Sequence, residues 1–122
     1  MTIQHIPQTR DTAQLDDLGP VGIPLSEPAC ALRARKIVIP GAEATSAGIW
    51  ECSPGQFRRQ VQEGEIMHIL AGEGSFTPDG QPPLQFRAGD TLAMPPHTQG
   101  VWDIRSTVRK LYVLAPPSQA EN

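Results

Sequence analysis

Several features that would assign a protein class at once are missing from this sequence. It has no run of about 20 apolar residues, the length that a membrane helix needs, so we expect no membrane partner. Basic residues form no block, and ten lysines and arginines stand against thirteen acidic residues, giving a net charge of -3. Because nucleic-acid binding depends on concentrated positive charge, we expect no nucleic-acid partner either.

The sequence is also poor in cysteine and carries no signal for secretion. Cys30 and Cys52 are the two cysteines, and two alone make no disulfide framework. They form no Cys-x-x-Cys motif of the kind used for zinc or redox chemistry, so we expect both thiols to be reduced. Residues 1–17 are polar and contain no apolar signal-peptide region. We therefore expect a cytoplasmic protein.

Glycine and proline, in contrast, are abundant. Eleven glycines and thirteen prolines make up about a fifth of the 122 residues, whereas average usage is roughly 12%. Both residues interrupt helices, so a helical bundle is excluded. With 39% hydrophobic residues the chain can still build a core. The composition predicts a turn-rich β domain with no helix longer than about three turns.

Short apolar runs alternate with turn signals along the middle of the chain. Their spacing of roughly ten residues is typical of a sandwich or barrel. We divide the chain into an N-terminal arm over 1–28, one domain over 29–115 and a tail over 116–122. Prolines at 20, 24 and 28 exclude a helix in the arm, which we expect to lie along the sheet or across a partner subunit. The expected strands are 31–39, 47–52, 56–61, 65–70, 75–77, 84–86, 91–94, 101–104 and 108–114.

Two segments carry a resemblance to a known superfamily. Residues 65–74 read EIMHILAGEG and resemble the end of the first cupin motif, and residues 89–95 read GDTLAMP and resemble the start of the second. Pro95 stands six positions after Gly89, as the cupin pattern requires. The resemblance implies an all-β fold, a single small jelly-roll barrel of cupin type with an extended N-terminal arm.

The resemblance narrows to one cupin family. Residues 48–55, 100–102 and 107–112 resemble the family related to (S)-ureidoglycine aminohydrolase, a group largely of unknown function. The similarity covers about residues 45–115. It implies a fold, but it assigns no substrate.

The metal ligands that cupin enzymes use are mostly absent. Most enzymatic cupins bind a divalent metal with two histidines, a glutamate and a third histidine. Counting back from Glu65, the positions of the first two histidines are held by Arg59 and Val61. With one more intervening residue they are held by Arg58 and Gln60. Gly100 stands at the position of the third histidine. A substitute set of Glu65, His68, His97 and Gln99 is the alternative, although strand alternation places His68 on the face opposite Glu65. We therefore predict no bound metal and no other cofactor.

Strand alternation places a different set of side chains inside the barrel. Arg59, Val61, Glu65, Met67 and Trp102 share the interior, unless the turn at 62–64 shifts the phase. Arg59 then either pairs with Glu65 in place of a metal or binds a carboxylate or ureido oxygen of a small ligand. Glu65 is also a candidate general base. The alternation leaves open which of Arg109 and Lys110 faces inward. The candidate ligand-binding residues are Arg59, Glu65, Met67, His97, Gln99 and Trp102.

Two functions fit this reading. The first is a metal-free cupin that binds a small polar or carboxylated molecule. The second is an enzyme with aminohydrolase-like chemistry on a small ureido or amino compound. A third, of the sugar-nucleotide epimerase type, needs a His–Asp pair in the barrel, and His68 faces away from it. Because Ile66, His68 and Leu70 form a largely apolar stripe on the outer face, we also expect a homodimer.

Overall fold

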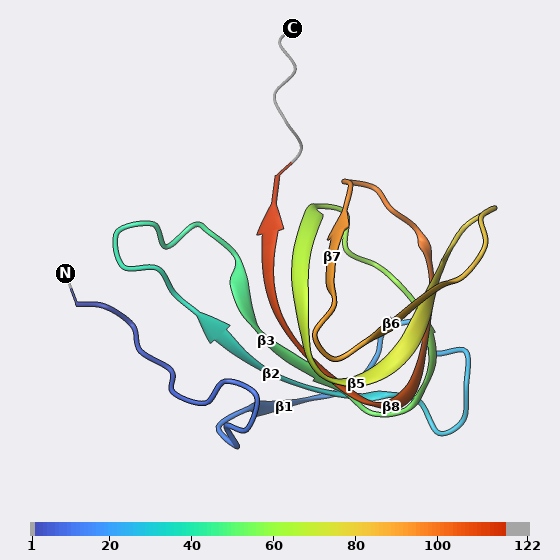
Figure 1. The fold of residues 1–122 in the computed structure, drawn as a ribbon, viewed down its shortest axis with the longest axis horizontal. Helices are drawn as coiled ribbons and strands as arrows, with labels where there is room; N and C mark the ends of the chain where they lie inside the picture. The colour runs from blue at the N-terminus through green and yellow to red at the C-terminus, as the bar shows by residue number, and fades with distance from the viewer. Residues whose placement is uncertain (1, 117–122) are drawn as a thin grey trace, which may run out of the picture.

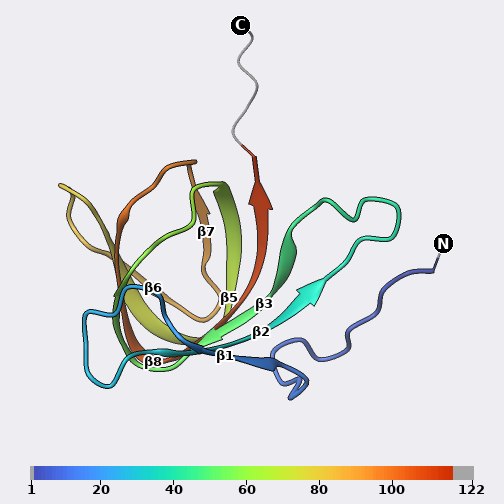
Figure 2. The ribbon, with the colours of Figure 1, turned by 180° about the vertical axis from the view of Figure 1, so that it is seen from behind.

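The computed structural model describes residues 2–116, and they form eight strands and no helix. The strands are β1 (Asp16–Pro20), β2 (Ala31–Ile37), β3 (Ala47–Cys52), β4 (Gly55–Arg58), β5 (Gly64–Pro78), β6 (Leu84–Arg87), β7 (Thr91–Met94) and β8 (Gly100–Ala115). Strands β5 to β8 curve around a common interior, and β1 to β3 extend the sheet to one side (Figures 1 and 2). The predicted all-β jelly-roll barrel is confirmed. Of the predicted tail, all but Pro116 lies outside the described residues.

The two longest strands, β5 and β8, organise the barrel. They pair with each other from Gly64 opposite Ala115 to Pro78 opposite Gly100. The sheet runs in the order β1-β2-β3-β8-β5-β6, while β4 pairs with β8 and β7 pairs with β5. All of these pairings are antiparallel. The first half of β5 pairs with β7 and with the last half of β8, and the second half of β5 pairs with β6 and with the first half of β8. Each long strand therefore belongs to both sides of the barrel.

An irregular segment in β5 makes this double role feasible. The register between β5 and β8 shifts between Ile69 and Gly74, and such bulges bend and twist a strand without ending it. Gly72 has a φ of +86°, and a Cβ there would collide with the Thr107 carbonyl. The segment that reads as a turn between two short strands is therefore a bulge within one long strand. The expected strands 101–104 and 108–114 are likewise parts of one strand, β8.

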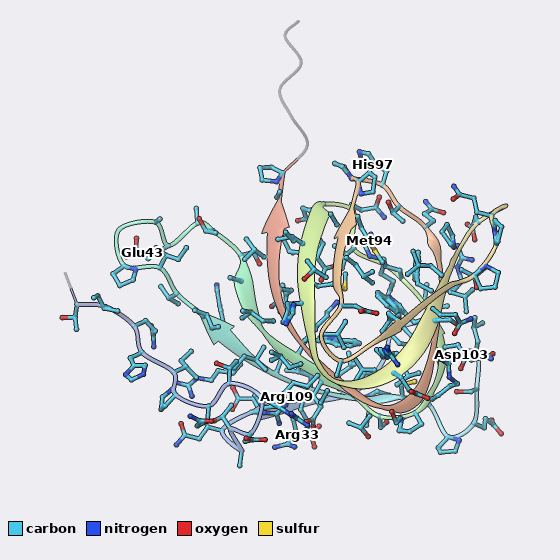
Figure 3. The ribbon with its side chains drawn as sticks, in the orientation of Figure 1. Arg33, Glu43, Met94, His97, Asp103 and Arg109 are labelled. Carbon is cyan, nitrogen blue, oxygen red and sulfur yellow. The ribbon has the colours of Figure 1, made fainter. Side chains whose placement is uncertain are left out.

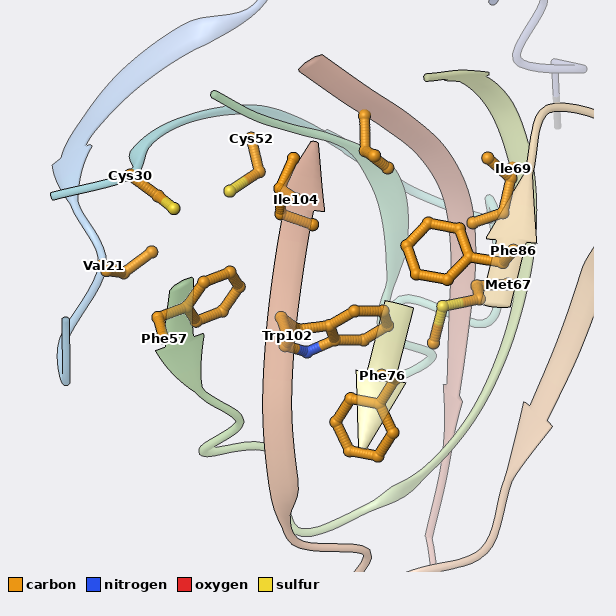
Figure 4. Close-up of a cluster of buried hydrophobic side chains, with 11 residues drawn as sticks. Val21, Cys30, Cys52, Phe57, Met67, Ile69, Phe76, Phe86, Trp102 and Ile104 are labelled. Atoms are coloured by element: carbon orange, nitrogen blue, oxygen red, sulfur yellow. The ribbon is translucent and has the colours of Figure 1, made fainter. Parts of the chain in front are cut away.

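The core is centred on Trp102. Its ring lies among three phenylalanines, with centroid distances of 4.7 Å to Phe76, 5.6 Å to Phe86 and 6.5 Å to Phe57 (Figure 4). Aromatic pairs at these separations add to the stabilisation from burial alone. Cys30 and Cys52 are buried free thiols in the same cluster. Burial raises the pKa of both, so they remain protonated.

The N-terminal segment packs on its own barrel. Strand β1 pairs with β2, Val21 is buried in the core, and Pro24 forms a β-bridge with Phe57. The Ile23 and Leu25 side chains remain exposed. Within the predicted arm, residues 16–20 thus lie along the sheet, which is one of the two expected arrangements. Nowhere in residues 2–116 is there a helix that could cross a membrane.

Candidate functional site

A cavity of about 150 Å³ opens into the barrel interior. Aromatic and aliphatic side chains, buried or half-buried, form half of its lining, and charged side chains meet at one side. It is lined by Val21, Gly22, Leu32, Trp50, Phe57, Arg58, Arg59, Gln60, Val61, Glu65, Trp102 and Lys110. Liquid water occupies roughly 30 Å³ per molecule, so the cavity has the volume of about five waters. Its size suits a ligand of few non-hydrogen atoms.

Glu65 is the centre of the charged group. Its Oε1 accepts a hydrogen bond from Arg59 Nη2 at 3.0 Å, and its Oε2 accepts one from Lys110 Nζ at 2.8 Å. The side chains of Arg59 and Glu65 are 2% exposed and that of Lys110 is 8% exposed. Two buried cations therefore share one buried carboxylate. Ion pairs at this depth persist because each charge has lost its water and depends on its partners.

Arg59 is held firmly by backbone oxygens. Its Nη1 donates to the carbonyls of Val61 and Thr98, both at 2.9 Å, and its backbone N–H donates to the Gly100 carbonyl at 3.0 Å. These bonds fix the guanidinium beside Glu65. Its Nε, however, is buried without a hydrogen-bond partner among the described residues. A buried donor of this kind costs free energy unless an acceptor reaches it.

Lys110 is surrounded by aromatic rings. Its Nζ lies 4.5 Å from the Trp50 ring centroid, 5.2 Å from that of Trp102 and 5.9 Å from that of Tyr112, within the range of cation–π attraction. Burial lowers the pKa of Lys110, and the Arg59 charge acts in the same direction, while Glu65 opposes the shift. The ammonium is thus stabilised by its neighbours but has lost its hydration.

The structure brings together four of the six residues singled out from the sequence. Arg59, Glu65 and Trp102 line the cavity, and Met67 lies beside it with its Sδ 3.8 Å from Lys110 Nζ. The turn at 62–64 keeps the phase, because Glu65 and Arg59 meet inside the barrel.

His97 and Gln99 do not line the cavity. Both are exposed, and His97 lies at the rim of the barrel, where its Nδ1 contacts Gln62 Oε1 at 3.3 Å (Figure 3). Strand β7 ends at Met94, and His97 has a φ of +64°. After Pro95 the chain is no longer in a strand: the Thr98 carbonyl reaches Arg59, while the His97 and Gln99 side chains are exposed.

Lys110 and Trp50 also line the cavity, and sequence reasoning did not assign them to it. They lie directly opposite each other in the β3–β8 ladder, so both side chains project from the same face of the sheet. Strand alternation does place Val108, Lys110 and Tyr112 together on one face of β8. It does not say which face of β8 is interior, and Arg109 on the other face is buried as well.

The described residues do not assemble the ligand set of a metal-binding cupin. Residues 2–116 contain no group of three histidine, cysteine, aspartate or glutamate side chains that could bind a metal. His5, His68 and His97 are all exposed, and His68 Nδ1 contacts Thr91 Oγ1 on the outer face. At Gly100, the position of the third histidine, a Cβ would lie 2.7 Å from Phe76 Cζ and collide with the Thr77 carbonyl.

A second group of charges lies on the opposite face of the sheet. Glu51 accepts hydrogen bonds from Arg33 at 3.0 Å and from Arg109 at 2.8 Å. Arg109 Nη1 also donates to the carbonyls of Thr9, at 3.2 Å, and Thr12, at 2.6 Å. Arg33 and Arg109 appear beside the N-terminal segment in Figure 3. This group fastens that segment to β8 and is separate from the cavity.

Comparison with solved structures identifies proteins of the same fold. The EutQ protein of Clostridium difficile is 16% identical with a TM-score of 0.64, and the match covers 79% of this chain and 81% of that one. A DUF861 family protein of unknown function from Pseudomonas syringae pv. tomato is 23% identical with a TM-score of 0.73, covering 84% of this chain and 45% of that one. Ectoine synthase from P. lautus is 18% identical with a TM-score of 0.67, covering 97% and 80%.

The comparison with family models is more specific. No curated protein matches the sequence. The model of the EutQ-like cupin domain matches residues 41–112, which include β3 to β7 and most of β8. The match takes in Arg59, Glu65 and Lys110, the three charged residues of the cavity. The chain belongs to the family of EutQ-like cupin domains.

Proposed function

We propose that this cupin works without a metal and binds one small carboxylated molecule in the cavity beside Glu65. The observation that supports the proposal is the sharing of one buried carboxylate by two buried cations. With Lys110 protonated, the group carries an excess of one positive charge. A carboxylate on the ligand would balance that excess where water is largely excluded.

The unpartnered donor of Arg59 supports the same ligand chemistry. Its Nε–H is buried without an acceptor among the described residues, and Arg59 lines the cavity. A carboxylate oxygen is a strong acceptor for a guanidinium N–H. The aromatic and aliphatic wall would hold the short carbon chain of the ligand, as in most small-molecule sites.

The metal-free part of the proposal rests on charge and space. Both carboxylate oxygens of Glu65 already accept hydrogen bonds from cationic side chains. A divalent cation at Glu65 would therefore face two positive charges in a poorly solvated site. Elemental analysis of the purified protein tests this, since a stoichiometric amount of manganese, iron, nickel or zinc would contradict it.

Calorimetric titration tests the ligand class. We expect lactate to bind and lactamide, its neutral counterpart, not to bind. Lys110→Met should weaken lactate binding at least about tenfold, because a hydrogen bond to a charged group contributes roughly 1.5–3 kcal/mol. Lys36→Met is the matched control, since Lys36 is exposed on β2. Equal binding of lactate and lactamide, or unchanged binding to Lys110→Met, would overturn the proposal.

A second candidate is an enzyme with aminohydrolase-like chemistry on a small ureido or amino compound. The contact of 2.8 Å between Glu65 and Lys110 favours it, because the pair offers an acid and a base at one point of the cavity. The resemblance of residues 48–55, 100–102 and 107–112 to the ureidoglycine aminohydrolase group supports the same direction. Release of ammonia from ureidoglycine by the purified protein, lost in Glu65→Gln, would establish it over simple binding.

A further inference from the structure

The amine of Lys110 has surroundings that a merely structural cation does not need. Lys110 lines the cavity, so its side chain lies next to a molecule bound there. A carboxylate stands 2.8 Å away, and three aromatic rings enclose the other sides. A lysine in an apolar enclosure next to a second cation is the environment in which amines become nucleophiles.

We propose that Lys110 forms a Schiff base with the carbonyl carbon of a small oxo acid bound in this cavity. The inference rests on the proposed function, because the carboxylate of the oxo acid would occupy the anion position beside Arg59. It narrows the ligand class to short molecules that carry both a carboxylate and an aldehyde or ketone. Arg59 and Lys110 lie on the two oxygens of the same carboxylate, so the two recognition points are close together.

The reaction needs no reagent beyond the protein and the ligand. Glu65 Oε2 takes a proton from the Lys110 ammonium across their 2.8 Å contact, which frees the lone pair of Nζ. Nζ then attacks the carbonyl carbon, a C–N bond forms, and one proton of Nζ passes to the carbonyl oxygen, which becomes the hydroxyl of a carbinolamine. Protonation of that hydroxyl by Glu65 breaks the C–O bond and releases water. The nitrogen lone pair completes the C=N bond, so the products are a protonated imine beside the Glu65 carboxylate and one water, with no change of oxidation state.

Burial supports the first of these steps. Desolvation and the Arg59 charge both lower the pKa of Lys110, which brings its neutral form closer to physiological pH. After the proton moves to Glu65, Arg59 remains the cation of the group and keeps its contacts with the carbonyls of Val61 and Thr98. The site then still holds a positive charge for the ligand carboxylate.

Reductive trapping tests the proposal on the whole chain. Lys36 and Lys110 are its two lysines, so labelled side chains are easily told apart. The protein is incubated with pyruvate and cyanoborohydride at neutral pH, and adducts are located by peptide mass spectrometry. Each adduct adds the mass of pyruvate less one oxygen atom. We expect about tenfold more adduct on Lys110 than on Lys36, because Lys110 lines the cavity that would hold the pyruvate carboxylate and Lys36 is exposed on β2; that ratio corresponds to about 1.4 kcal/mol of preferential binding.

Variants and competing ligands test the reactive amine and the carboxylate site separately. Lys36→Arg should still be labelled at Lys110, while Lys110→Arg, which retains the charge beside Glu65, should not be labelled at position 110. Excess lactate should prevent the labelling of Lys110.

An equal or larger share of adduct on Lys36, or no adduct on Lys110, would overturn the proposal. If lactate binds in the calorimeter but pyruvate is not trapped, the Schiff base fails while the proposed function stands. Trapping of acetaldehyde as readily as pyruvate would support the amine chemistry and contradict the carboxylate site.

Discussion

At the scale of single residues, Glu65 differs from its two partners because it alone carries the negative charge of the cluster. Loss of Arg59 leaves Glu65 paired with Lys110, and loss of Lys110 leaves it paired with Arg59. Loss of the Glu65 charge strands two buried cations at once. Breaking a buried pair costs roughly 3–5 kcal/mol, mostly because an uncompensated charge stays behind.

We therefore expect Glu65→Gln to destabilise the protein more than Arg59→Met or Lys110→Met does, by an amount at or above about 3–5 kcal/mol. The double variant Arg59→Met with Glu65→Gln should be milder than the sum of its parts, because one cation instead of two is then left unpaired. Urea unfolding of the singles and the double measures the coupling. A coupling energy below about 0.5 kcal/mol would show that Arg59 and Glu65 do not interact.

The sequence allowed part of this site to be predicted. Counting positions by the cupin pattern and by strand alternation put Arg59 and Glu65 at one place in the barrel, and both rules hold within regular strands. Lys110 escaped this reasoning because residues 108, 109 and 110 are all buried. With both faces of β8 covered, burial no longer distinguishes inside from outside. His97 and Gln99 follow the end of β7 and do not line the cavity, and beyond the end of a strand alternation gives no guide to where a side chain points.

At the scale of elements, Arg109 connects the N-terminal segment to the sheet. Its guanidinium bonds to Glu51 and to the carbonyls of Thr9 and Thr12, so one side chain joins β3, β8 and the segment before β1. Glu51 keeps a second partner in Arg33, which limits the damage when Arg109 is removed.

Arg109→Met should therefore loosen residues 9–12 without opening the barrel. Two charge-assisted hydrogen bonds to backbone oxygens are lost, each worth roughly 1.5–3 kcal/mol. Hydrogen exchange followed by mass spectrometry should show faster exchange of the Asp11 and Thr12 amides, both of which donate to Gln8, and unchanged exchange in β5. Arg105→Met is the control, because Arg105 is an exposed arginine of the same strand that contacts Glu73 and the Gly74 carbonyl instead of residues 9–12. Unchanged exchange at Asp11 and Thr12 would show that other contacts hold the segment.

The element boundaries show where local sequence signals mislead. Residues 72–74 have the sequence of a turn, and Gly72 does adopt a positive φ, a backbone conformation that favours glycine. A tight turn and a bulge both favour glycine, so the local sequence does not distinguish them. The pairing with the neighbouring strand does. Because β8 continues past this point, β5 keeps its pairing and bends instead of reversing. The sandwich or barrel was thus predictable from strand spacing, while the continuity of its two longest strands was not.

At the scale of the whole molecule, the outer face of β5 and β8 exposes apolar side chains beside one another. Ile66 is 52% exposed, Val113 37% and Leu111 36%. Ile66 lies opposite Val113 in the ladder, and His68 lies opposite Leu111. Side chains opposite each other share a face, so these residues form one continuous stripe. A stripe of this kind favours association with a second copy, because two identical faces cover each other about a twofold axis.

We predict that the protein is a homodimer joined through this stripe, with twice the 13.2 kDa mass of the chain in light scattering at micromolar concentration. Ile66→Glu should yield monomers, since it places a charge in the centre of the interface. Leu84→Glu is the matched control, an exposed leucine on β6. A wild-type mass near that of one chain would refute the dimer.

Because Ile66 and Glu65 project from opposite faces of β5, Ile66→Glu should separate the protomers and still allow pyruvate to be trapped on Lys110. Loss of trapping together with the dimer would instead mean that the cavity depends on the partner subunit.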